Sequence, residues 1–201
     1  AATLAGQPSD YQRWSLPRLQ AEIARVLGEF GESAAGRLSS AAGEAWAAGQ
    51  QLIDAPIAAG GVRIEAVLPL LDSQQLLAMR AFMTDRIKDV GVQAANKINT
   101  ELGLVTLGAQ SPGEAVGKVA EILGEGSRGR ALTIVRTELG RVFATAAQGR
   151  AEQAAAILPG LKKQWRRSGK VYPRWTHVAA DGQVREVGMP FNVGGVALMY
   201  P

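Results

Sequence analysis

The sequence contains no cysteine, and only one of its 201 residues is a histidine, His177. The absence of cysteine excludes disulfide bonds, thiolate metal sites, iron–sulfur clusters and a cysteine nucleophile. It fits a reducing compartment or an assembly that needs no disulfides. Aromatic residues are also scarce, at 5% of the chain, which argues against a bulky aromatic core.

Long hydrophobic runs are missing as well. No apolar run approaches the roughly 20 residues that a helix needs to cross a bilayer. The first residues also lack the charged and then apolar segments of an export signal. We therefore expect a soluble protein with no membrane partner. The chain starts at Ala1 rather than at methionine, which fits either processing or a longer product.

Small residues take the place of the missing large ones. The chain has 34 alanines and 24 glycines, and 47% of its residues are hydrophobic. This hydrophobic content excludes an acidic, solvated, disordered chain. Because so much of it is alanine, we expect thin helices that pack closely.

The formal net charge is +4, but the two signs are unevenly distributed. Residues 1–127 hold 10 basic and 14 acidic side chains, a balance of −4. Residues 128–201 hold 12 basic and 4 acidic side chains, a balance of +8. We therefore divide the chain into a helical, acidic region (1–127) and a basic region (128–201), and expect an anionic partner for the second.

Apolar residues recur every three or four positions in three long stretches, which is the spacing of one helix face. The stretches run from Ser15 to 61, from after Asp72 or Ser73 to Val105, and from Leu132 to Ala147. Ser15 is the expected N-cap of the first helix, and Gly43 is a point where that helix could be interrupted. Ser111, Pro112 and Glu114 have the chemistry of a capping box and open a shorter helix between the second and third stretches.

The residue pattern of the chain changes at two places after residue 123. Glycines at 124, 126 and 129 predict a flexible joint at the charge boundary. After residue 160 helical periodicity stops, and apolar runs at 184–187 and 196–200 predict strands. Turns are expected at the Asp-Gly pair 181–182 and the Gly-Gly pair 194–195. The sequence thus predicts an α+β fold, in which a predominantly helical N-terminal region of long Ala-rich helices precedes a small C-terminal module with short β-strands.

The densest positive feature is a run of six basic residues with no acid between them, interleaved with Trp165, Tyr172 and Trp175. The six are Lys162, Lys163, Arg166, Arg167, Lys170 and Arg174. In a helix five of them share one stripe, whereas in a strand Trp165 points inward between basic neighbours. The pattern favours an anionic partner, and nucleic acid and an acidic protein fit it equally. It also fits a solvated basic face whose tryptophans belong to a small core.

Two further groups of charged residues invite a functional interpretation. Arg136 and Glu138 lie two residues apart in the last long helix, so they cannot face each other. They predict either a buried polar node that links this helix to the C-terminal module or an ordinary helix surface. His177, Asp181 and Glu186 suggest a metal or acid–base site, but their spacing matches no ligand motif. We expect a structural histidine beside a turn, and no catalytic or metal-ligating residue.

Taken in order, several of these residues resemble the C-terminal domain of phage minor head proteins, the phage Mu F-like head morphogenesis family. They are Arg136-Thr137-Glu138, Lys163, Trp165, Arg174, His177, Asp181-Gly182-Gln183, Pro190-Phe191 and the apolar ending at Tyr200-Pro201. The match covers about residues 130–201. Members of the family usually carry an acid before the Arg-x-x-His, where this chain has residues 169–171. They also usually continue from the final proline into Gly-Asp-Pro, whereas this sequence stops at Pro201.

The resemblance implies a virion protein without enzymatic activity or cofactor, present in low copy at the portal vertex or inside the capsid. Such a protein assists head morphogenesis in the host cytoplasm and contacts the portal protein, the major capsid protein or both. Packaged double-stranded DNA and a homo-oligomer are further expected partners. The helices of residues 1–127 lie outside the resemblance, and they fit intramolecular core, a docking surface or an oligomer interface.

Two alternatives compete with this interpretation. The first is a free-standing nucleic-acid-binding protein that uses the basic run 162–174. The second, less favoured, is a metal-dependent nuclease or toxin-associated module centred on His177.

Overall fold

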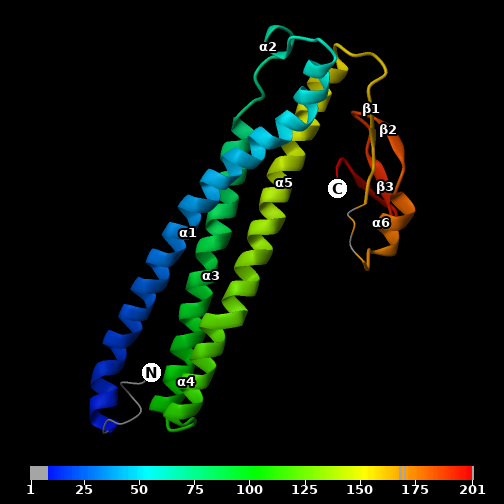
Figure 1. The fold of residues 1–201 in the computed structure, drawn as a ribbon. Helices are drawn as coiled ribbons and strands as arrows, with labels where there is room; N and C mark the ends of the chain where they lie inside the picture. Colours follow the sequence, from blue (N-terminus) through cyan, green and yellow to red (C-terminus); the bar gives the residue numbers. More distant parts are fainter. Residues whose placement is uncertain (1–8, 168, 170, 201) are drawn as a thin grey trace. The chain divides into compact units, whose positions relative to one another are not determined.

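The computed structural model describes residues 9–167, 169 and 171–200 (Figure 1). Its helices are α1 (Ser9–Ala59), α2 (Ile64–Val67), α3 (Gln74–Thr106), α4 (Pro112–Glu121), the π-helical turn η1 (Ile122–Gly126), α5 (Ser127–Ala155) and α6 (Trp175–Ala180). Its strands are β1 (Lys162–Gln164), β2 (Val184–Glu186), β3 (Phe191–Val193) and β4 (Val196–Leu198). Long helices followed by short antiparallel strands confirm the α+β expectation. Within the described residues, no helix combines the length and the apolar character that crossing a membrane requires.

Helix α1 departs from the expected boundaries at its N-terminal end. It already includes residues 9–14, which contain no glycine or proline that would stop a helix, so Ser15 is not its N-cap. It also continues without a break through Gly43, which lies between the good helix formers Ala42 and Glu44. The helix ends where it was expected to, before Gly60 and Gly61, and Gly61 has a φ of +90°.

Helices α3 and α4 follow the sequence pattern closely, whereas α2 and α6 were not expected, and α6 lies in the region predicted to form only strands and turns. Helix α3 begins two residues after Asp72, whose carboxylate accepts a hydrogen bond from the Gln74 amide. Helix α4 opens with the expected capping box, in which the Glu114 amide donates to Ser111 Oγ and the Ser111 amide donates to Glu114 Oε2. The same hydrogen bonds lower the pKa of the Glu114 carboxyl below its ordinary value.

The glycine-rich joint is a kink rather than an open loop. The backbone continues through the single turn η1, and Gly124 (φ −83°, ψ −108°) is the residue that leaves helical geometry there. Helix α5 starts directly afterwards at Ser127, so Gly129 lies inside it. The chain therefore changes helix direction at one glycine, without losing more than one turn of helix.

The chain forms two compact units. Unit 1 comprises the residues up to Ala41 together with Ala78–Glu138, and unit 2 comprises Ala42–Leu77 together with Leu139–Pro201. The division falls within α1, within α3 and within α5. The charge boundary before Arg128 instead coincides with the start of α5.

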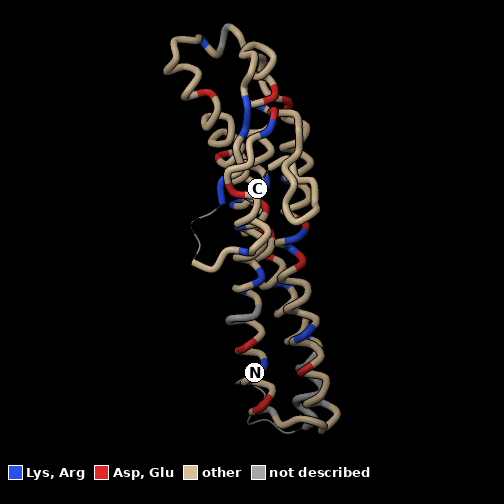
Figure 2. The backbone as a smooth tube through the Cα atoms, turned by 90° about the vertical axis from the view of Figure 1, so that its right-hand side faces the viewer, with Lys and Arg blue, Asp and Glu red and all other residues tan. Residues whose placement is uncertain are grey.

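Unit 1 is built from helices that approach one another through small residues. Its parts of α1, α3 and α5 lie side by side (Figure 1), and a Cβ on Gly91 would stand only 2.7 Å from the Leu27 carbonyl oxygen. Ile98 and Leu102 of α3 are buried beneath apolar side chains of α1, α4 and η1. Acidic and basic residues are interspersed along these helices (Figure 2), and Arg130 of α5 pairs with Asp89 of α3 at 2.9 Å.

Unit 2 combines the second part of α1, the second part of α5 and the C-terminal module (residues 160–200). In this unit α1 and α5 approach each other closely at a glycine, since a Cβ on Gly49 would be 2.9 Å from the Ala146 Cβ. In the module β1 pairs with β2 and β3 pairs with β4, both antiparallel. The runs expected to form strands at 184–187 and 196–200 thus provide β2 and β4.

Candidate functional site

The first part of the basic run is a strand, not a helix. Lys162, Lys163 and Gln164 pair with Glu186, Arg185 and Val184 of β2 in an antiparallel register. Gly160, with a φ of +84°, turns the chain into this strand. Neighbouring side chains of a strand point to opposite faces, so Lys162 and Lys163 do not lie on one surface.

Trp165 follows β1 and forms the centre of the module's core. Its side chain is 1% exposed and packs with Phe191, Val193 and Ala180. The Trp165 and Phe191 rings meet edge to face with centroids 5.3 Å apart, and the His177 ring lies 5.6 Å away on a tilted plane. The expectation that Trp165 points inward from a strand is confirmed.

The Asp181-Gly182-Gln183 turn binds the pieces of the module together. Gly182 has a φ of +83°, and its amide donates to the Trp165 carbonyl at 2.9 Å. The Gln183 side chain donates to the Asn192 carbonyl and accepts from the Asn192 amide. The expected Asp-Gly turn is therefore present, and it connects the segment after β1 to β3.

Most of the described basic residues in the run already have partners within the module. Lys162 pairs with Glu186 at 3.3 Å, and the Arg167 Nε lies 3.4 Å from Asp181. Among the described residues, Arg166 and Arg174 have no ion-pair partner, and both are exposed. Lys170 lies outside the described residues. Lys162 and Arg167 thus have an acid beside them, in solvent-accessible ion pairs that an outside anion can replace at little cost.

Lys163 has a structural role that the sequence did not indicate. Its ammonium donates to the Met199 carbonyl at 2.7 Å and to Gln148 Oε1 at 3.2 Å, and it lies 5.1 Å from the centre of the Phe191 ring. Burial lowers the pKa of Lys163, which the negative charge of Glu152 partly opposes. Lys163 thereby ties β1 to α5 and to the end of the chain.

The segment after β1 and the first residue of α6 expose two large aromatic side chains near Arg174. Tyr172 is 93% exposed and Trp175 is 76% exposed. The expectation that the tryptophans belong to the core therefore holds for Trp165 but not for Trp175. We call Arg166, Tyr172, Arg174 and Trp175 the basic-aromatic segment.

The proposed metal or acid–base group is held apart by other contacts. Asp181 accepts from the Arg167 amide and faces its guanidinium, Glu186 faces Lys162, and His177 stacks near Trp165. Across the described part of the chain, no three His, Asp or Glu side chains gather closely enough to hold a metal ion. Each of these three side chains instead contacts another residue of the C-terminal module.

Arg136 and Glu138 separate as their spacing requires. Arg136 is exposed, whereas Glu138 is 2% exposed and accepts a hydrogen bond from Arg86 Nη1 at 2.7 Å. Glu138 thus contacts α3 of unit 1, and the expectation of a node joining α5 to the C-terminal module is not met at this contact. The reason is helical phase, since position 138 lies on the face of α5 that packs against α3.

Arg150 is a second buried charge on α5. It is 6% exposed and donates to Asp54 Oδ1, to the Pro69 carbonyl and to Gln153 Oε1. The only signal in the sequence is its position among the alanines of α5, where an apolar face is expected.

A cavity of about 390 Å³ lies within unit 2, next to Lys163 and Arg166. Apolar side chains such as Leu52, Phe143 and Phe191 line most of it, and Lys163 and Arg166 stand at its wall. Chemically it suits an apolar group that carries a negative charge.

Comparison of the chain with known families, with characterised proteins and with solved structures finds no match to any of them.

Proposed function

We propose that the chain is a minor head protein of a bacteriophage, a virion component without catalytic activity that acts at the portal vertex or inside the capsid. The observation that carries the proposal is the resemblance of residues 130–201 to the Mu F-like family. The proposed partners are the portal protein, the major capsid protein or both.

The contacts within the module support a structural role for the residues that carry the resemblance. Trp165 and Phe191 form its core, Gly182 makes the turn that bonds to Trp165, and Asp181 holds Arg167. Lys163 fastens β1 to α5. These side chains stabilise the module. The residue pattern that resembles the family can therefore be explained without a catalytic role.

The partner most compatible with the basic-aromatic segment is an acidic surface of another virion protein. Exposed Trp, Tyr and Arg are the residue types that most often dominate protein interfaces. Tyr172 and Trp175 would supply apolar contact area, and Arg166 and Arg174 would meet carboxylates.

The direct test is the composition of the particle. An antiserum or mass spectrometry should detect the chain in purified virions and in procapsids, and the chain should co-purify with the portal protein. Absence from purified particles contradicts the proposal. In the full chain, Trp175→Ala should weaken retention on immobilised portal, whereas Trp165→Ala is unsuitable because it removes the core.

Duplex DNA is the second candidate partner, because the same arginines and aromatic rings bind phosphates and stack on bases. If only Arg166 and Arg174 contact phosphates, the slope of log K against log salt should be about −2. Charge reversal at both residues should abolish binding, whereas Arg37→Glu with Arg63→Glu, which changes the net charge equally at two exposed positions outside the module, should leave it unchanged. Equal loss in both variants would indicate attraction by net charge alone.

A further inference from the structure

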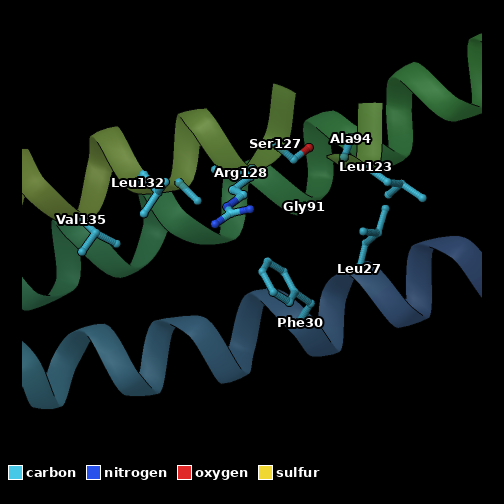
Figure 3. A pocket seen from close by; sticks show the side chains of 11 residues that line it. Leu27, Phe30, Gly91, Ala94, Leu123, Ser127, Arg128, Leu132 and Val135 are labelled. Atoms are coloured by element: carbon cyan, nitrogen blue, oxygen red, sulfur yellow. The ribbon is translucent and has the colours of Figure 1, made fainter. Parts of the chain in front are cut away.

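Unit 1 has an apolar groove between α1 and the start of α5, with α3 as its floor (Figure 3). The groove has a volume of about 330 Å³. Its lining includes Leu27 and Phe30 of α1, Gly91 and Ala94 of α3, and Leu132 and Val135 of α5. Because residues 91 and 94 are glycine and alanine, the groove is deep along α3. Its form suits the binding of a further helix.

Large apolar side chains stand at both walls of the groove and remain exposed. Phe30 is 55% exposed, and Val26, one turn before it on the same face of α1, is 49% exposed. On the opposite wall Leu132 is 43% exposed. A cluster of exposed apolar side chains around a groove is typical of an interaction surface.

The α5 wall also carries two cations, which we call the basic edge: Arg128 and Arg136. They lie one turn before and one turn after Leu132, about 12 Å apart along the helix axis. Both are exposed, and neither pairs with an acid among the side chains that the structure describes. Figure 3 shows Arg128 reaching from α5 toward Phe30. An occupant with two carboxylates about two helical turns apart would therefore complement the basic edge.

Helix α1 of the same chain has the matching pattern. Glu22 and Glu29, which we call the acidic edge, are seven residues or about 10.5 Å apart on α1. They flank the exposed Val26 and Phe30 on one side of the helix. Both acids pair with Arg25, but these ion pairs are solvent-exposed, and such pairs add little stability. Exchanging them for new partners therefore costs little.

We propose that unit 1 associates with a second copy of this chain, with α1 of each copy lying in the groove of the other. Val26 and Phe30 of one copy fill the apolar part of the groove, and its acidic edge faces the basic edge of the other copy. Two-fold symmetry produces this contact twice, which doubles the buried area toward the size that stable dimers need. The proposal does not depend on the proposed function of the protein.

The first test is the mass of the full chain in solution, measured by sedimentation equilibrium over a range of concentrations. The wild type should shift from monomer to dimer as concentration rises. Phe30→Asp should raise the dimer Kd by about thirtyfold or more, because it places a charge at the centre of the interface. Val92→Asp is the matched control, since Val92 is 58% exposed on α3 but lies outside this groove. Far-UV circular dichroism should show unchanged helix content in both variants.

The second test separates this interface from any other. Reversing the basic edge (Arg128→Glu with Arg136→Glu) should give a monomer, and so should reversing the acidic edge (Glu22→Arg with Glu29→Arg). An equimolar mixture of the two variants should form heterodimers, because each contact then pairs opposite charges again.

Three results would overturn the proposal. They are a wild-type chain that stays monomeric at all concentrations, a dimer that Phe30→Asp leaves intact, and reversed variants that fail to pair with each other. A groove that instead binds a helix of another protein gives the first result.

Discussion

Each compact unit buries one charged side chain of α5, and the two are accommodated differently. In unit 1 the buried Glu138 meets Arg86, whose side chain is 45% exposed and reaches inward from α3. In unit 2 the buried Arg150 meets Asp54 of α1, the Pro69 carbonyl and Gln153. A guanidinium has five N–H donors in a fixed plane, so burying it gathers acceptors from several segments. The Glu138–Arg86 pair joins α5 to α3, whereas Arg150 joins α5 to α1 and to the segment before α3.

The two units also differ in what fills their cores. Unit 1 depends on close approach at Gly91 and on medium-sized aliphatic side chains such as Ile98. The module of unit 2 depends on one tryptophan ring. Substitutions that act on one kind of contact should therefore affect one unit more than the other.

The largest effect is expected from Trp165→Ala. Removing a ring that is 1% exposed should lower the free energy of unfolding by about 3–5 kcal/mol. Urea denaturation measures the loss, and amide exchange should remain slow in α3 while it speeds up in β1 and β3. Trp175→Ala is the control, and a similar loss there would show that the two rings do not differ as described.

Arg150→Ala should cost about 3 kcal/mol, because it leaves Asp54 and the Pro69 carbonyl without their donor. Arg150→Lys should recover only part of this, since an ammonium cannot reproduce the three bonds of a planar guanidinium. Denaturant titration of both variants measures the difference. Full recovery by lysine would mean that charge alone, and not geometry, holds the node.

Glu138→Gln should cost less, about 1–3 kcal/mol. The amide keeps the shape and one acceptor oxygen, and Arg86 regains water because it is half exposed. The same titration, performed beside Arg150→Ala, compares the two buried charges directly. A larger loss for Glu138→Gln would reverse the ranking of the two nodes.

Two glycines of α3 should respond in opposite directions to alanine. Gly91→Ala drives a methyl against the Leu27 carbonyl and should destabilise by about 1–3 kcal/mol. Gly103→Ala meets open space and should stabilise by about 0.5–1 kcal/mol through helix propensity. Thermal unfolding of both variants checks the signs, and equal signs would contradict the close approach of α1 and α3.

The smallest effect is expected at the capping box. Ser111→Ala should cost about 1 kcal/mol. The folded state lowers the pKa of Glu114, so its contribution is present above the unfolded pKa and disappears as pH falls through the folded pKa. The difference between wild type and Ser111→Ala should therefore shrink in acid, which unfolding measured at neutral pH and near pH 3 can detect.

Local patterns in the sequence were sufficient for much of the fold. The capping box depends on residues only three positions apart, and the α3 stripe repeats over many turns, so both were predictable. The inward position of Trp165 followed from strand alternation once β1 was assumed. The helical state of residues 9–14 was not predicted, because Ser15 looked like an N-cap although the residues before it also favour a helix.

The partners of charged side chains depend on contacts between distant segments. Glu186 and Asp181 pair with two cations of the basic run, yet both come later in the chain, and no spacing rule assigns them to Lys162 and Arg167. Arg150 meets Asp54 across 96 positions. Such pairs exist only after folding, and this is why the sequence could not show which cations of the run have an acid beside them, and why it missed the buried node.

The kink at Gly124 has a consequence for insertions and deletions. Each residue added to a helix turns everything beyond it by about 100°. An extra residue beside Gly124 can be absorbed where the backbone already leaves helical geometry. The same residue added at Gly140 would rotate the rest of α5 and carry Arg150 away from Asp54. Length variation should therefore be tolerated at the kink and rejected near the middle of the helix that follows.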